Sequence, residues 1–142
     1  MACSTYIVAV LNTLPNNQTS KVDVSKDLKR GLHILSNFES DFIDLLTKHN
    51  EFKQFIDRQV SELKLSKVGE VYHDFPGGGF TAVVCLAESH LSIHTWPDIN
   101  YATFDVYLSN HSQDNSEKAK AIYSSVLQHF NAKILYENFI NR

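Results

Sequence analysis

The chain has 142 residues, of which 43% are hydrophobic and 20% charged, and its formal net charge at pH 7 is −3. This size and composition predict one globular domain over residues 1–142, and the slightly acidic balance gives no electrostatic reason to bind nucleic acid or a membrane surface. No apolar run reaches spanning length and no basic-then-apolar leader is visible, so a cytoplasmic protein is expected.

The first third of the chain is expected to hold a strand and a helix. Residues 6–11 are continuously apolar and rich in β-branched side chains, which is typical of a central strand buried on both faces. A loop is expected over residues 12–20. Four apolar residues then recur at helical spacing and predict a helix: Val24, Leu28, Leu32 and Leu35.

A longer helix is predicted next. Ser36 and Glu39 have the spacing of a capping box, in which a serine and a glutamate satisfy the first N–H groups of a helix. An apolar stripe follows, which predicts a helix from about residue 40 to residue 63 that can break near Asn50. His49 lies on this stripe and is expected to be a core or edge residue.

The second half of the chain predicts strands in hairpin order. Strands are expected over residues 67–73, 81–86 and 102–109, then a helix begun by residues 114–117, and a closing strand over residues 133–139. The glycine run at 77–79 leads into a strand, so it lacks the helix N-terminus that a phosphate loop requires. The pattern predicts an α+β fold, an antiparallel sheet with its helices packed on one face. The other face then needs cover, which a partner subunit could supply.

The cysteine and histidine residues predict neither a disulfide nor a metal site. Cys3 and Cys85 are isolated, and the apolar run around Cys85 predicts that it is buried. A set of four histidines could be considered for a metal ion: His73, His90, His94 and His111. No acidic or cysteine ligands accompany them at a suitable spacing, so no metal is expected.

One stretch gathers most of the reactive side chains. Residues 85–98, CLAESHLSIHTWPD, bring two His, two Ser, a Glu and a Trp together after a buried strand. A serine with a nearby base is the minimum for nucleophile activation. From the pattern alone, satisfied structural groups on a strand are the commoner interpretation.

Residues 87–98 resemble the Glu-Ser-His-(Leu/Ile)-(Ser/Thr)-Ile-His-Thr-Trp-Pro-Glu segment of the bacterial and archaeal S-adenosylmethionine decarboxylases. These are pyruvoyl enzymes that cut themselves between that Glu and Ser. The resemblance implies cleavage between Glu88 and Ser89, giving chains 1–88 and 89–142. The Ser89 hydroxyl would convert the peptide bond to an ester, a base would remove the Cα proton, and elimination would leave a dehydroalanine. Loss of ammonia would then turn this residue into a pyruvoyl group at position 89. Backbone strain at the cut bond would favour the first step.

The resemblance also assigns roles to other residues. His94 is implied as the processing base, and Thr81 as the hydroxyl that assists the acyl shift. Residues 89 and 94 are five apart, so in a regular strand they face opposite ways, and a bend or bulge between them is expected.

The implied activity is S-adenosylmethionine decarboxylation in spermidine biosynthesis. The pyruvoyl ketone would form a Schiff base with the substrate amine and accept electrons, without a metal or external cofactor. Phe75 and Trp96 are implied to flank the substrate and Asp98 to bind its ribose. A homodimer is the implied assembly.

Three positions depart from the family pattern. Ser109 stands where the family has its proton-donating catalytic Cys, Asp98 stands where it has Glu, and residues 6–10, taken as its first strand, lack its acidic residue. Two alternatives therefore stay open: a pyruvoyl decarboxylase with a changed substrate such as ornithine or arginine, and a catalytically inactive regulatory relative.

Overall fold

A computed structural model describes residues 29–142, so the strand predicted at residues 6–11, the loop at 12–20 and Val24 and Leu28 lie outside the described part. In order along the chain the elements are β1 (Leu32–Glu39), α2 (Ile43–Thr47), α3 (His49–Glu62), β2 (Lys67–Asp74), β3 (Phe80–Leu86), β4 (Ser89–Trp96), the 3₁₀ turn η1 (Pro97–Ile99), β5 (Tyr101–Leu108), α4 (Ser116–His129) and β6 (Lys133–Asn141). None of the helices in residues 29–142 has the length and apolar character needed to cross a bilayer.

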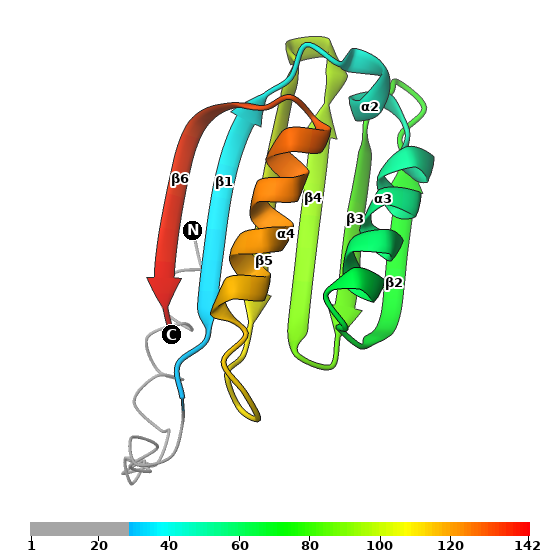
Figure 1. Ribbon diagram of the computed structural model, residues 1–142. Helices are drawn as coiled ribbons and strands as arrows, with labels where there is room; N and C mark the ends of the chain where they lie inside the picture. The colour runs from blue at the N-terminus through cyan, green and yellow to red at the C-terminus, as the bar shows by residue number, and fades with distance from the viewer. Residues whose placement is uncertain (1–28) are drawn as a thin grey trace, which may run out of the picture.

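The strands form one antiparallel sheet in the order β2-β3-β4-β5-β1-β6. Figure 1 shows the helices on one face of this sheet, with α3 over β2 and β3 and α4 over β5 and β1. The predicted α+β class and the packing of the helices on one face are confirmed. We call the opposite face, which no described helix covers, the open face.

Strand alternation divides the side chains between the two faces. In β3, β4 and β5 the residues turned toward the helices are buried, among them Val84, Ile93 and Phe104. Buried aromatic rings contributed by the sheet and helices pack at the centre of this layer, with Phe52 5.7 Å from Phe80 and 6.1 Å from Phe130 between ring centroids. Since side chains alternate along a strand, the intervening residues lie on the open face.

The helix prediction that included Leu32 and Leu35 is wrong, because these residues belong to β1. Every second residue of β1 from Leu32 to Phe38 is buried, which is the period of a strand. The capping box is wrong for the same reason: Ser36 lies within β1 and hydrogen-bonds to the Tyr123 hydroxyl. Pairing with β5 and β6 on both sides of β1 outweighs the local helical pattern.

The predicted long helix is two helices. Lys48 has extended backbone angles, φ −139° and ψ 149°, and so separates α2 from α3 two residues before the expected break at Asn50. His49 then opens α3, where its ring stacks on Tyr72 and its Nδ1 lies 2.8 Å from Asp74 Oδ1. His49 is therefore an edge residue, as predicted.

Candidate active site

The Glu88–Ser89 peptide bond lies at the tip of the tight turn that joins β3 to β4. Ser66 holds this turn from the side: its carbonyl accepts a hydrogen bond from Ala87 N–H at 2.7 Å, and its own N–H donates to Glu88 Oε2 at 3.2 Å. The bond therefore stands at the end of the sheet in a fixed position.

Ser89 has an unusual backbone conformation. Its φ is +150°, a value that residues other than glycine seldom adopt. If side chains alternated strictly along β4, the Ser89 side chain would lie on the helix-covered face, as Leu91 does. Instead its Oγ lies 3.1 Å from Nδ1 of His90, whose side chain is on the open face. The expected bulge between residues 89 and 94 is wrong, because β4 keeps an unbroken register with both neighbouring strands.

Ser109 lies beside the same peptide bond. Its backbone N–H donates a 2.8 Å hydrogen bond to the carbonyl oxygen of Glu88. The side chain of Asn115, which is buried, donates to the Ser109 carbonyl at 2.8 Å and so fixes the residue from behind. This N–H is placed to stabilise negative charge that develops on the Glu88 oxygen during attack on its carbon.

His94 and Thr81 are close to each other but not to Ser89 of the same chain. They face one another across β3 and β4, with Thr81 Oγ1 2.6 Å from His94 Nδ1. At roughly 3.3 Å per residue, five residues of regular strand separate His94 from Ser89 by about 16 Å. Ser89 and His94 therefore lie at opposite ends of β4.

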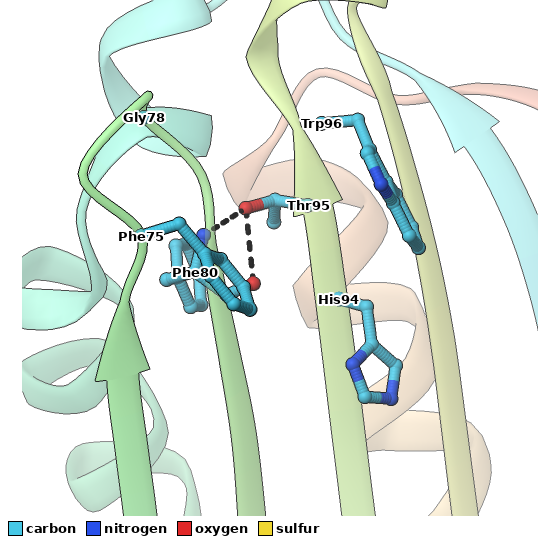
Figure 2. Close-up of a pocket in the computed structure, with 6 residues that line it drawn as sticks. All are labelled: Phe75, Gly78, Phe80, His94, Thr95 and Trp96. Carbon is cyan, nitrogen blue, oxygen red and sulfur yellow. Dashed lines mark hydrogen bonds between the residues drawn. The ribbon is translucent and has the colours of Figure 1, made fainter.

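A pocket of ≈ 240 Å³ adjoins His94, lined by Phe75, Gly78, Phe80, His94, Thr95 and Trp96. Figure 2 shows His94 and Trp96 extending from the same strand, while Phe75 and Phe80 come from the segment that leads into β3. The Thr95 hydroxyl fixes the inner wall, because it accepts from Phe80 N–H at 2.8 Å and donates to the Leu46 carbonyl at 2.7 Å.

The rim of this pocket includes several residues to which the sequence analysis gave a role. The glycine-rich segment turns back into β3, so it is a hairpin loop and no helix follows it. Phe75 and Trp96, the two aromatics expected at the substrate, line one cavity. Asp98 is exposed in η1 and is not among the lining residues.

A further polar cluster was missed by the sequence reasoning. On the open face, Asp105 Oδ2 lies 3.3 Å from His33 Nε2 and 3.4 Å from His90 Nε2, while its Oδ1 accepts a hydrogen bond from Ser92 Oγ. We call His33, His90 and Asp105 the His-Asp cluster. Their donor atoms lie within 4.8 Å of one another, so the structure gathers a different set from the four histidines considered above. The two-residue period of β1 could have revealed His33, because it places the His33 side chain on the other face of the sheet from the buried Leu32 and Ile34.

The expected burial of Cys85 is wrong. Only one face of β3 is covered, and Cys85 is exposed on the other. It pairs across the strands with His90, one position from the pairing of Leu86 with Ser89.

Comparisons with known proteins relate this chain to one family. A family model described as S-adenosylmethionine decarboxylase matches residues 32–142. The chain is similar to the S-adenosylmethionine decarboxylase proenzymes of Aquifex aeolicus, 40% identical over 54% of this chain and 57% of that protein, and of Archaeoglobus fulgidus, 34% identical over 64% and 79%. The matched segment thus spans little more than half of the Aquifex relative.

A solved structure extends the similarity to the fold. The crystal structure of the adenosylmethionine decarboxylase from Aquifex aeolicus superposes with a TM-score of 0.71 and 32% identity, covering 81% of this chain and 92% of that chain. Because the family match begins at Leu32, the assignment of residues 6–10 to the first family strand is wrong, and β1 takes that place. The chain belongs to the S-adenosylmethionine decarboxylase family.

Proposed function

We propose that this chain is a self-processing proenzyme that cuts itself between Glu88 and Ser89 and then acts as a pyruvoyl-dependent decarboxylase of S-adenosylmethionine. One observation carries the proposal: the hydrogen bond from Ser109 N–H to the Glu88 carbonyl, at a bond followed by a serine with φ of +150°. Residues in such sparsely populated conformations cost on the order of 1–3 kcal/mol and concentrate at functional sites.

These features suit the first step of processing. Ser89 Oγ attacks the Glu88 carbon, the Oγ–C bond forms, and the Glu88–Ser89 C–N bond breaks, leaving an ester and a free amine. Charge on the Glu88 oxygen is stabilised by the Ser109 N–H, and breaking the bond releases the strained backbone. Removal of the Cα proton of residue 89 then expels the Glu88 carboxylate and leaves a dehydroalanine, whose imine tautomer takes up water and releases ammonia. The pyruvoyl group that forms supplies an electron sink for decarboxylation of an α-amino acid.

The base that removes the Cα proton comes from a second copy of the chain in this proposal. His94 is about 16 Å from Ser89 along the same strand, and the open face exposes apolar side chains such as Val83 and Trp96, 39% and 43% exposed. In a face-to-face dimer the two-fold axis would lie between the two open faces, perpendicular to β4 and level with the point between Leu91 and Ser92. Such an axis would lay Ser89 against His94 of the partner subunit. A symmetric dimer then contains two equivalent sites and covers both open faces.

The pocket supports the substrate assignment. At ≈ 240 Å³ it lies below the range of about 300–1,000 Å³ typical of whole ligand sites, so it suits one flat ring system. Phe75 and Trp96 offer aromatic faces for an adenine base, and the remainder of S-adenosylmethionine would extend toward the pyruvoyl group across the dimer interface. In this proposal Asp98, on the exposed turn after Trp96, meets the ribose.

The proton donor of the decarboxylation differs from the family pattern. Ser109 stands at the donor position, and a hydroxyl is a far weaker acid than a thiol. Cys85 carries the only thiol among residues 29–142, and its exposure on the open face makes it the second candidate. The cytoplasmic location stays a prediction.

Release of carbon dioxide from carboxyl-labelled substrates tests the activity. We expect release from S-adenosylmethionine, none from ornithine or arginine, and none with Ser89→Ala. Release from ornithine or arginine alone would support the changed-substrate alternative. Processed protein that releases carbon dioxide from none of the three would support the inactive relative.

A further inference from the structure

The Ser89 hydroxyl has a base beside it in its own chain. His90 Nδ1 lies 3.1 Å from Ser89 Oγ, while the other ring nitrogen, Nε2, lies 3.4 Å from Asp105 Oδ2. When a serine contacts an imidazole that in turn contacts a carboxylate, the hydroxyl proton can pass to the imidazole. The carboxylate then stabilises the imidazolium cation that results. Ser89 and His90 lie on β4, and Asp105 lies on the neighbouring strand β5.

Asp105 is held in place for this role. Ser92 Oγ donates to its Oδ1, and His33 Nε2 lies 3.3 Å from its Oδ2, so both oxygens have polar partners. The Tyr107 ring packs beside both histidines, with centroids 5.6 Å from His33 and 6.1 Å from His90. The exposed fractions of the side chains fall from 36% for His90 through 25% for Asp105 to 12% for His33. The cluster is thus anchored on the His33 side and open on the Ser89 side.

We propose that His90 is the general base of the acyl shift, oriented by Asp105, and that it acts within its own chain. The inference rests on the proposed self-cleavage and assigns one step of it. His90 Nδ1 takes the Ser89 hydroxyl proton as Oγ bonds to the Glu88 carbon, and it returns that proton to the Ser89 nitrogen as the C–N bond breaks. No proton is gained or lost over the step. His94 of the partner subunit is left for the later removal of the Cα proton, and the acyl shift is assigned to His90 in place of Thr81, to which the resemblance gave it.

The distances of the two histidines from Ser89 decide which step each can catalyse. His94 cannot reach Ser89 within one chain, and its Nδ1 already lies 2.6 Å from Thr81 Oγ1. His90 contacts the Ser89 hydroxyl of its own chain, without a second subunit. The acyl shift should therefore proceed in a protomer whose partner cannot supply His94, whereas elimination should not.

Hydroxylamine separates the two steps, because it cleaves an ester and leaves a peptide bond intact. Chains made by cell-free synthesis would be followed over time by intact mass, with and without hydroxylamine. The wild type should cut itself, and His94→Ala should stay full length but split at residue 88 with hydroxylamine. His90→Ala should stay full length and resist hydroxylamine, with processing slowed at least about 100-fold, the lower end of general-base contributions. Added imidazole should partly restore its rate.

Controls keep the result specific to His90. His111→Ala alters an exposed loop histidine and should process like the wild type. Asp105→Asn leaves His90 in place and should stall at the same hydroxylamine-resistant stage, with part of the rate recovered in Asp105→Glu. If His90→Ala fails to fold by circular dichroism, His90→Gln replaces it.

Three results would overturn the assignment: a His90 variant that processes at the wild-type rate, one that accumulates a hydroxylamine-sensitive ester, or wild-type processing that stops with a chelator. The last would mean that the His-Asp cluster holds a metal ion. A wild-type chain that never cleaves would instead contradict the proposed function itself.

Discussion

The backbone N–H of Ser109 and the carbonyl oxygen of Glu88 are joined by a 2.8 Å hydrogen bond that links the end of β5 to the β3–β4 turn. The contact uses main-chain atoms, so it does not depend on the side chain at position 109. Processing and turnover should therefore respond differently to substitutions there.

Ser109→Cys should process like the wild type but turn over faster. The backbone donor to Glu88 is kept, whereas a thiol is a stronger acid than a hydroxyl and works better as a general acid near neutral pH. Protonation on the wrong carbon would convert the pyruvoyl end into alanine and inactivate the enzyme, so the small chain of the variant should also carry less N-terminal alanine.

Cys85→Ser is the matched variant for this experiment. It removes the exposed thiol on β3 and leaves Ser109 unchanged. If Cys85→Ser loses most of the turnover while Ser109→Cys gains none, Cys85 is the donor and the assignment to position 109 is wrong.

Co-expression of Ser89→Ala with His94→Ala tests the shared site. Alone, neither chain should yield the two fragments, the first for want of a nucleophile and the second for want of a base. Together, the Ser89→Ala chain can supply His94 to its partner, so the His94→Ala chain should be cut at residue 88. Distinct affinity tags and intact mass identify which chain is cleaved. A wild-type protein that sediments as a monomer and still cleaves would rule out this arrangement.

Gly79→Ala should destabilise the fold and damage the pocket. Gly79 has φ +89°, and a Cβ there would lie 2.6 Å from the Thr95 carbonyl oxygen and 3.1 Å from Pro97. Backbone strain of this kind costs about 1–3 kcal/mol. Gly77→Ala is the control, because a Cβ at Gly77 meets nothing within 4 Å. Urea unfolding of the uncleavable Ser89→Ala background should separate the two, and equal stabilities would count against the close approach of this loop to β4.

His129→Phe should make the stability less dependent on pH. Burial lowers the pKa of His129, whose ring stacks on Phe55 at 4.2 Å and whose Nε2 is buried without a hydrogen-bond partner among residues 29–142. Below the ordinary histidine pKa of about 6.5, the unfolded chain takes up a proton before the folded chain does, so the free energy of unfolding falls as pH drops.

The His129→Phe substitution keeps the ring contacts and removes this titration. The measurement is urea unfolding at several pH values between neutral and moderately acid, again in the Ser89→Ala background. The difference in unfolding free energy between chains with and without the substitution should shift in favour of the substituted chain as the pH falls. A constant difference would contradict the burial argument.

The sequence predicted the strands and helices best where their pattern was reinforced by turns. The glycine-rich hairpin before Phe80 and the alternation in β5 both hold in the structure. Leu32 and Leu35 misled because four apolar residues happened to share helical spacing, while the choice of strand depended on pairing with β5 and β6, more than 60 residues away along the chain. The two-residue period of β1 was present in the sequence, but the pairing that selects it over the helical spacing comes from residues far along the chain.

The site was only partly predictable for the same reason. Glu88, Ser89 and His94 stand together in one short segment, whereas the His-Asp cluster joins residues 33 and 105, which come together only through sheet order. Cys85 was judged buried because its neighbours are apolar, and the uncovered face of the sheet reverses that conclusion.

Self-cleavage is the central claim, and the intact mass of freshly purified protein tests it most directly. We expect two chains split after Glu88, with the smaller one lacking a free amine at residue 89. A single full-length species of 16.2 kDa after prolonged incubation would contradict self-cleavage.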